Sequence, residues 1–562
     1  MDNLDMIIIG AGVYGIQAAR TYLEFHPSHN IAILEADSCP GGVWSANRMY
    51  DAFWTQSPLE MWEYSDQPLK DVELKDTHHM YFQARHFTVY LDGYLKSHVY
   101  GGKTLTDRIV LNTKVERLWK ENGVWHAQTS SGKSYIAPKV IDASGLTSIP
   151  NIPQIPGANT FKGKMIHHKD FGRSDIWTCK TCVVVGGAKS AADVAYAYAK
   201  AGLEVHWVIR KSGNGPAAYF PADSPVSYYQ NSNEAFHHRM MASMSASIFT
   251  PESWWTRFLQ QTAIGRACVK FVWGYLQREL YSRAKYDRKD GQENGFMNLK
   301  PDTGLFWQND SSGVNQRADF FDTIAKKVKV YRQDIECIDI HNVHLANGTT
   351  IDADAIVFAT GWKDSPLYID PHTAYYLGLA TPKSAEDLKE ASKWATLETS
   401  ADAEILKRYP ILSNPPPCHK RSFTETPFRL YKSILPIHDR SIVFLGRMVL
   451  ANHTYNAEVQ SLFAIAALDN TLNLPSEADM EEEVASVRAW QKRRYPARGE
   501  AGNWFWYDIV PYTDAVLKQL GLESHRMKGV SDFFRPAVAK NLEGLVEEYR
   551  KKTGGSEDRK TR

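Results

Sequence analysis

The sequence predicts an α/β protein made of two interleaved doubly wound units, with a helical insertion and a helical C-terminal region. Two stretches with the same order of elements carry this prediction. In the first, the apolar run Met6–Ile9 leads into a glycine-rich turn, a helix over Val13–Phe25 and a strand over Ile31–Leu34. In the second, an apolar run over 182–185 leads into another glycine-rich turn, a helix-like segment and a strand over 205–209. This order is typical of a Rossmann-like dinucleotide-binding unit.

The chain divides at the proline-rich segment 149–157, because its prolines exclude a regular helix or a central strand. The expected parts are a first unit over 1–150, a second unit over 151–350 with an aromatic-rich helical insertion at 213–300, a return to the first unit over 351–475, and a helical extension over 476–562 with a frayed tail. Further strands are expected at 109–115, 124–128, 140–142, 328–331, 343–345 and 355–358.

The bulk composition is that of an ordinary globular protein. Of 562 residues, 43% are hydrophobic and 23% charged, and the formal net charge is +1. This balance gives no electrostatic reason to expect a nucleic-acid or membrane partner. The 6 cysteines predict no disulfide framework, and no uncharged apolar run reaches the ~20 residues of a membrane span. With the first strand so near the start, we expect no targeting peptide and a cytoplasmic protein of undetermined oligomeric state.

The first glycine-rich turn has the residues that a dinucleotide requires. Gly10 and Gly12 allow a tight turn and keep side chains out of the path of a pyrophosphate, and Gly15 lets helix and strand pack closely. The N-terminus of the following helix faces the anion. Glu35 ends the second strand, where its carboxylate can accept hydrogen bonds from ribose hydroxyls. The sequence therefore predicts a dinucleotide site here.

The second glycine-rich turn begins at Gly186 and has the small Ala188 at its second conserved position. Ser190 adds a hydroxyl that can reach a phosphate oxygen. Arg210 and Lys211 follow the next strand, where an acid would accept the ribose hydroxyls of NADH. Two cations suit a 2′-phosphate, which favours NADPH, although a solvated basic pair would give the same sequence.

Several motifs resemble those of the flavin-containing monooxygenases, class B flavoprotein monooxygenases. Gly42 and Trp44 belong to a Gly-Gly-x-Trp element after the ribose acid. Residues 161–171 are similar to the fingerprint Phe-x-Gly-x-x-x-His-x-x-x-(Phe/Tyr), and they end in Phe171 where the Baeyer–Villiger branch has Trp. The resemblance covers about 1–212 and 340–475, and its overall look is of the fungal secondary-metabolism enzymes.

This resemblance implies an FAD site in the first unit and an NADPH site in the second. Gln56 stands where the family has its active-site Asn, and Asn452 and His453 are expected near the isoalloxazine ring, so these three are the catalytic candidates. The candidate cofactor-binding residues are Gly10, Gly12, Gly15, Glu35, Gly42, Trp44, Thr55, Val115, Gly361 and Gly446 for FAD, and Gly186, Ala188, Ser190, Arg210 and Lys211 for NADPH.

The resemblance implies that NADPH reduces FAD, that the reduced flavin forms a C4a-(hydro)peroxyflavin with O2, and that one oxygen atom passes to a small, largely apolar substrate. Nitrogen, sulfur or an activated carbon is the expected acceptor, and a Baeyer–Villiger reaction on a ketone is the alternative. A flavin disulfide reductase using Cys179 and Cys182 is less favoured, because Cys182 begins a strand. No metal site is expected. The insertion's aromatic residues either line a substrate cavity or pack a core.

Overall fold

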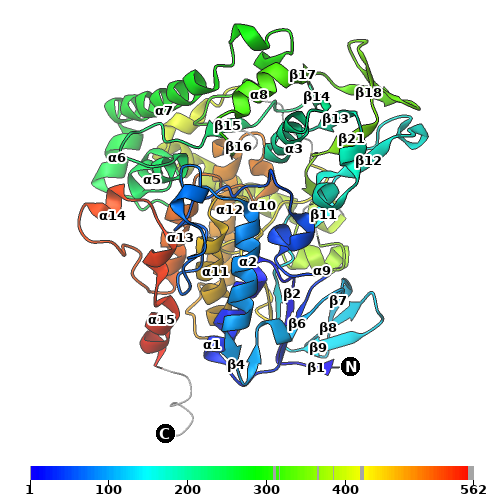
Figure 1. Ribbon diagram of the computed structural model, residues 1–562. Helices are drawn as coiled ribbons and strands as arrows, with labels where there is room; N and C mark the ends of the chain where they lie inside the picture. Colours follow the sequence, from blue (N-terminus) through cyan, green and yellow to red (C-terminus); the bar gives the residue numbers. More distant parts are fainter. Residues whose placement is uncertain are drawn as a thin grey trace.

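The computed structural model describes residues 2–307, 312–315, 317–363, 366–383, 385–417 and 423–554. Its framework is a pair of five-stranded parallel sheets (Figure 1). The structure confirms the predicted α/β class, and the two sheets interleave in sequence because each takes strands from distant parts of the chain. Among the described helices, none combines the length and apolarity needed to cross a bilayer.

The first sheet has the strand order β23-β10-β2-β3-β6. Its members are β2 (Met6–Ile9), β3 (Ile31–Leu34), β6 (Ile109–Val110), β10 (Val140–Asp142) and β23 (Ile442–Phe444). Helix α1 (Val13–Phe25) packs against α11 (His453–Leu468), which is buried along its whole length behind its first residue. Strand β23, from the second stretch of the first unit, completes the sheet that begins at the N-terminus, as the resemblance implied.

The second sheet has the order β12-β21-β13-β14-β17. Its members are β12 (Lys164–His167), β13 (Thr181–Val185), β14 (Glu204–Ile209), β17 (Val328–Arg332) and β21 (Ala355–Phe358). Helices α3 (Lys189–Lys200) and α8 (Phe320–Lys327) pack together beside it. Because β21 pairs with β12 and β13, the second sheet extends past the boundary expected at residue 350.

One strand prediction in the first unit was wrong. The expected strand over 109–115 is divided into β6 and the start of β7 (Val115–Glu121), which belong to different sheets. Asn112 lies between them with a φ of 52°, a left-handed conformation that interrupts an extended chain. β7 joins a side sheet with β8 (Val124–Thr129), β9 (Ser134–Ala137) and β1 (Asp2–Asn3).

Short strands complete the β structure. The linker strand β11 (Ile149–Pro150) pairs with β22 (Trp362–Lys363), so the two passages between the units run side by side. The remaining strands are β4 (Val99–Tyr100), β5 (Lys103–Thr104), β15 (Ala218–Pro221), β16 (Ser312–Asn315), β18 (Ile335–Ile338), β19 (Asn342–Leu345) and β20 (Thr350–Asp352).

The insertion and the C-terminal region are helical, as predicted, and lie on one side of the two sheets (Figure 1). The insertion contains α4 (Ser232–Phe236), α5 (Arg239–Met244), α6 (Trp254–Gln261) and α7 (Ala263–Ala284). The other helices are α2 (Ala84–Ser97), α9 (Pro371–Tyr376), α10 (Ala385–Arg408), α12 (Glu477–Arg494), α13 (Ile509–Gln519), α14 (Ser531–Phe534) and α15 (Leu545–Thr553). The expected frayed tail falls largely on 555–562, outside the described residues.

Candidate active site

The two glycine-rich turns are built alike. Gly10 has a φ of +98°, and a Cβ there would lie 2.7 Å from the carbonyl oxygen of Ala143. Gly186 has a φ of +140°, and its Cβ would lie 2.3 Å from the carbonyl oxygen of Ala359. Both positions therefore require glycine for conformation and for space. In each unit the glycine-rich turn packs against an Ala-x-Gly segment that follows a neighbouring strand. This segment is 143–145 in the first unit and 359–361 in the second.

Gly12 and Gly15 are glycines for different reasons. A Cβ on Gly15 would lie 1.9 Å from the carbonyl oxygen of Gly10, so the helix–strand contact itself excludes a side chain. A Cβ on Gly12 would meet only the Cα of Gly42, at 3.8 Å, and the φ of Gly12 is an ordinary −85°. The protein's own packing does not require glycine at position 12, so the open space there fits a ligand.

The N-terminus of α1 adds an anion site to that space. Gly12 is its N-cap and supplies no side-chain hydrogen bond, so the first N–H groups of the helix remain available to a ligand. Beside it, Glu35 Oε2 accepts from Ala11 N at 2.8 Å and Oε1 from Asp37 N at 2.9 Å, while burial raises the pKa of this carboxyl. The Glu35 carbonyl accepts from Thr113 N at 2.7 Å, close to the start of β7 at Val115. These features fit the pyrophosphate and ribose of FAD.

The second turn also fits a dinucleotide. Ala188 is the N-cap of α3 and, like Gly12, provides no side-chain cap. Arg210 and Lys211 are exposed directly after β14, and within the described ranges neither forms an ion pair. An open helix N-terminus beside two exposed cations suits NADPH. Lys189, the first residue of α3, forms a buried ion pair with Asp193 at 2.5 Å.

A cavity of about 360 Å³ lies between the two units and the insertion. It brings together five of the predicted site residues, namely Trp44, Gln56, Ser190, Asn452 and His453. The wall also includes residues that the sequence analysis missed: Trp54, Trp62, His168, Phe220, Asn233, Phe236 and Trp362. A larger surface groove of about 1420 Å³, between α6, α10 and α12, contains none of the predicted residues.

The cavity wall is rich in aromatic side chains. Trp44 packs edge-on against Trp62, with ring centroids 5.2 Å apart, and stacks on Phe53. The cavity is therefore aromatic, with a few polar groups, as a flavin ring requires.

The insertion holds the segment that carries Thr55 and Gln56. Thr55 N donates to the Phe82 carbonyl at 2.9 Å, and Phe82 N donates to Thr55 Oγ1 at 3.3 Å. Asn233 Nδ2, on α4, donates to the carbonyl oxygen of Gln56 at 2.9 Å. No motif pointed to Asn233, because the resemblance did not reach the insertion.

His453 is a neutral hydrogen-bond donor in the cavity wall. Asn456 Nδ2 donates to Tyr14 Oη at 2.8 Å, so the Tyr14 hydroxyl is free to donate to His453 Nδ1, 3.1 Å away. With Tyr14 as the donor, the proton of the neutral ring lies on Nε2, which is the tautomer we assign. Burial lowers the pKa of His453 to about 4, which keeps the ring neutral at pH 7.

Two backbone conformations fix the start of α11. Asn452, the N-cap of α11, has a φ of 56°, which is uncommon for a residue other than glycine. Gly446 has a φ of +68°, and a Cβ there would lie 2.7 Å from the Tyr14 ring. The absence of a side chain at Gly446 therefore leaves room for the Tyr14 ring in the position where its hydroxyl contacts His453.

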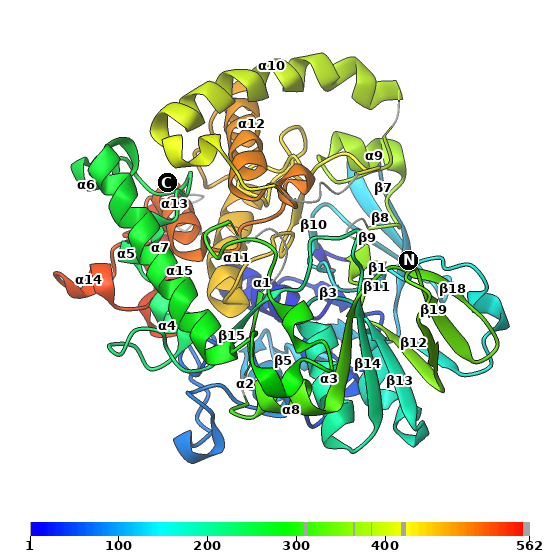
Figure 2. The ribbon, with the colours of Figure 1, turned by 90° about the horizontal axis from the view of Figure 1, so that it is seen from above.

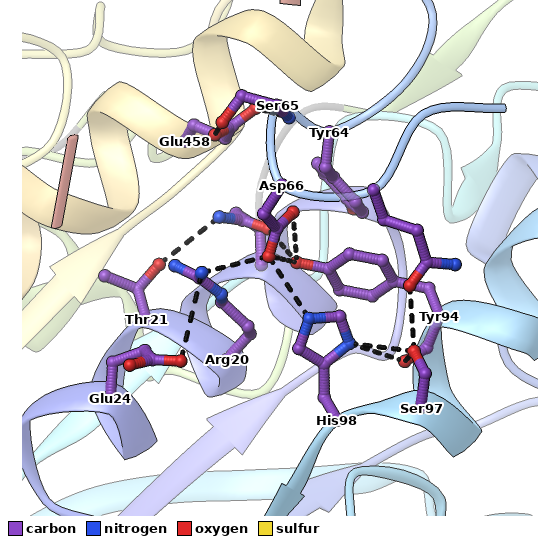
Figure 3. Close-up of polar contacts among 12 residues, drawn as sticks. Arg20, Thr21, Glu24, Tyr64, Ser65, Asp66, Tyr94, Ser97, His98 and Glu458 are labelled. Atoms are coloured by element: carbon purple, nitrogen blue, oxygen red, sulfur yellow. Dashed lines mark hydrogen bonds and ion pairs between the residues drawn. The ribbon is translucent and has the colours of Figure 1, made fainter. Parts of the chain in front are cut away.

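A polar network around Asp66, buried on its Arg20 and Tyr94 side, anchors the segment after Gln56 (Figure 3). Asp66 accepts from Arg20 at 2.9 Å, from the Tyr94 hydroxyl at 3.1 Å and from His98 Nε2 at 3.1 Å. These partners come from α1 and from the end of α2, so the network ties the segment to both helices.

The same segment is tied to α11. Glu458 accepts from Ser65 N at 2.7 Å and from Ser65 Oγ at 2.5 Å, as Figure 3 shows. Thr454 Oγ1 donates to the Met61 carbonyl at 3.0 Å. Since α11 also carries His453, these contacts fix the catalytic candidates from the two segments relative to each other.

The fingerprint histidine His167 joins the two passages between the units. Its Nε2 donates to the Gly361 carbonyl at 3.0 Å, and its Nδ1 accepts from Lys169 N at 3.2 Å. Both ring nitrogens are bound to the main chain, which agrees with a structural role rather than that of a general base. Phe171 is fully buried behind Tyr50, with ring centroids 5.0 Å apart, and does not line the cavity.

The two cysteines of the reductase alternative lie outside the cavity. Cys182 is fully buried in β13, and burial raises the pKa of both Cys179 and Cys182. Redox-active cysteines need a stabilised thiolate, which this setting opposes. In the part of the chain that the structure describes, no group of His, Cys, Asp or Glu side chains could hold a metal ion.

Comparisons with known proteins identify the family of the chain. The family model described as pyridine nucleotide-disulphide oxidoreductase matches residues 7–235. The chain is 30% identical to "FAD-dependent monooxygenase DEP4" of Fusarium langsethiae over 98% of this chain and 95% of the relative. It is 32% identical to an "FAD-dependent monooxygenase" of Pyrenophora dematioidea over 93% of this chain and 99% of the relative.

Solved structures share the fold. The open crystal structure of cyclohexanone monooxygenase matches with a TM-score of 0.60 at 15% identity, covering 93% of this chain and 98% of that one. S-allyl-L-cysteine S-oxygenase from Allium sativum matches with a TM-score of 0.51 at 15% identity, covering 98% and 93%.

Two dinucleotide-binding turns, with residues of both units around one aromatic cavity, are the features of a flavin-dependent oxidoreductase. Together with full-length relatives at 30% identity or more, this places the chain among the FAD-dependent monooxygenases, to which it belongs.

Proposed function

We propose that this flavin monooxygenase uses NADPH to reduce FAD and transfers one oxygen atom of O2 to a small, largely apolar molecule. The acceptor atom is a nitrogen, a sulfur or an activated carbon, and the reaction belongs to secondary metabolism, as the fungal relatives suggest. The observation that carries the proposal is the convergence of Gln56, Ser190, Asn452 and His453 on one aromatic cavity between the two units.

The residues present fit both cofactors. Gly12, Glu35 and the N-terminus of α1 would hold FAD, and Ala188, Arg210 and Lys211 would hold NADPH. When bound, FAD supplies the redox chemistry with O2 and NADPH supplies the hydride.

Within this cavity the chain's own residues orient the reactants and exclude water. The aromatic wall keeps water away from the reacting atoms, which suppresses unproductive hydrolysis and peroxide loss. His453 presents a neutral Nε2–H donor whose tautomer is set by Tyr14. Gln56 supplies a side-chain amide where the family has the shorter asparagine. The main-chain carbonyl of Gln56 accepts a hydrogen bond from Asn233.

Rapid mixing of the NADPH-reduced holoenzyme with oxygenated buffer tests the proposal. A transient absorbance that differs from both the reduced and the oxidised flavin, followed by ¹⁸O incorporation from ¹⁸O2 into product, is the expected result. Direct return to oxidised flavin with stoichiometric peroxide, with every substrate offered, would overturn it. A panel of amines, thioethers and ketones separates heteroatom oxygenation from the Baeyer–Villiger alternative.

His453→Phe keeps the ring in the wall but removes the donor. We expect the transient to form and to decay faster, because a hydrogen bond to it is lost. An unchanged lifetime would show that His453 does not contact the reacting atoms.

A further inference from the structure

Helix α7 is apolar on two opposite faces. Its inner face packs into the core through Val269, Trp273, Leu276 and Leu280, all nearly fully buried. A surface helix normally carries polar residues on the opposite face. On α7 that face is apolar too, so the interior of the protein does not account for the whole helix.

The outer face carries a continuous apolar stripe. Ile264 is 70% exposed and Phe271 73%, and Cys268 and Tyr275 are also exposed. Their spacing of four, three and four residues places these side chains along one line of the helix. The small Ala267 lies on the same face.

Basic residues accompany this stripe. From residue 263 to 285 the chain has five Lys or Arg, namely Arg266, Lys270, Arg278, Arg283 and Lys285, against the single acid Glu279. Lys270 and Arg278 are exposed, and no described residue forms an ion pair with either of them. The balanced net charge of the whole chain conceals this local excess.

The stripe lies on the periphery of the molecule. Both views place α6, α7 and α14 on one side, away from the strands β18 and β12 (Figures 1 and 2). The same side carries further exposed apolar residues: Trp254 at the start of α6 is 79% exposed, and Val530 beside α14 is also 79% exposed. A contiguous exposed apolar patch is characteristic of an interaction surface, and the α7 stripe forms one.

We propose that the α6–α7 face docks onto the surface of an anionic phospholipid bilayer, with α7 lying in the plane of the headgroups. An apolar face with Lys and Arg at its margins is the pattern of an interfacial helix, because the apolar side chains enter the acyl boundary while the cations meet lipid phosphates. A second copy of the chain fits less well, since a twofold contact would bring the same basic margin against itself. This inference is independent of the substrate proposed above.

Vesicle co-sedimentation of the FAD-loaded full chain tests the proposal. We expect binding to phosphatidylcholine vesicles containing phosphatidylserine, weaker binding without phosphatidylserine, and loss of binding as salt is raised. The pair Lys270→Gln and Arg278→Gln should weaken binding about 25-fold, because each cation near an anionic surface contributes a factor of about 5. The pair Ile264→Ser and Phe271→Ser should remove the apolar contribution at equal charge.

The matched control is Ile340→Ser, which alters an exposed apolar residue between β18 and β19, on the opposite side of the molecule. It should bind vesicles like the wild type. All variants are compared at equal flavin content and thermal stability, because exposed substitutions change stability little. Absent binding to both vesicle types, or equal binding by the Ile264/Phe271 variant and the control, would overturn the proposal. A change in oligomeric state of that variant without a change in lipid binding would overturn it in favour of a protein interface.

Discussion

Replacing Gly12 by alanine separates what the fold needs from what the cofactor needs. The added Cβ would meet only the Cα of Gly42, at an ordinary contact distance of 3.8 Å. The φ of −85° is accessible to alanine. We therefore expect Gly12→Ala to fold and to lose FAD.

The magnitudes follow from the geometry. The apoprotein should change in stability by less than about 1 kcal/mol, the usual cost of alanine at a helix N-cap. The methyl group would stand where the pyrophosphate approaches the N-terminus of α1 and would disrupt about two charge-assisted hydrogen bonds. At about 1.5–3 kcal/mol each, their loss amounts to about 3–6 kcal/mol, a weakening of FAD binding by two to four orders of magnitude.

Gly15→Ala is the matched comparison. Its Cβ would lie 1.9 Å from the carbonyl oxygen of Gly10, so helix and strand must separate, at a cost of about 2–3 kcal/mol. Flavin titration by fluorescence measures FAD affinity, and denaturant unfolding of the apoproteins measures stability. Gly12→Ala should lose FAD affinity but keep its stability, whereas Gly15→Ala should lose stability.

Two results would refute this reasoning. Normal flavin content in Gly12→Ala would show that the pyrophosphate does not occupy the space before α1. A large stability loss in apo Gly12→Ala would show that the position is constrained by packing rather than by a ligand.

Three further variants test other parts of the site. Arg210→Ala should raise KM for NADPH far more than for NADH, because only NADPH carries a 2′-phosphate, and equal increases would count against that assignment. The pair Cys179→Ser and Cys182→Ser should leave NADPH-dependent oxygen consumption intact; loss of turnover in a folded variant would restore the disulfide-reductase alternative. Burial raises the pKa of Glu458 from 4.5 to about 8, so its contribution to stability is fully present below pH 4.5 and is lost as pH rises through about 8. Glu458→Gln should gain stability relative to the wild type by up to about 1 kcal/mol per pH unit across this window, measured by denaturant unfolding, and a pH-independent difference would show that the carboxyl ionises normally.

The parts of the fold that local pattern determines could be predicted from the sequence. The bounds of β2, α1, β3 and β10 agree with those expected, because buried parallel strands are continuous apolar runs and the glycine turns mark where they end. The strand over 109–115 failed because Asn112 adopts a left-handed conformation, which tertiary context selects.

The candidate site was less accessible to sequence reasoning. Gln56 and His453 could be found because motifs mark them, whereas Asn233 comes from the insertion and has no local signal. No local signal pairs Arg20 with Asp66, and only the fold brings their side chains within 2.9 Å of each other. The sequence left two roles open for the insertion's aromatic residues, a substrate cavity or a core; Trp273 lies in the core, while Phe271 lies on the surface and fits neither role.

The hydrogen bond from Asn233 to Gln56 has a consequence for how such enzymes diversify. The cofactor turns lie in the two sheet units, while the insertion contributes Phe220, Asn233 and Phe236 to the cavity wall. Changes at Asn233 and Phe236 can therefore reshape the wall without contacting the glycine-rich turns, whereas Ala217 and Tyr219 of the same insertion donate hydrogen bonds to the Gly187 carbonyl of the second turn. At these wall positions substrate preference can diverge while the two cofactor turns are retained.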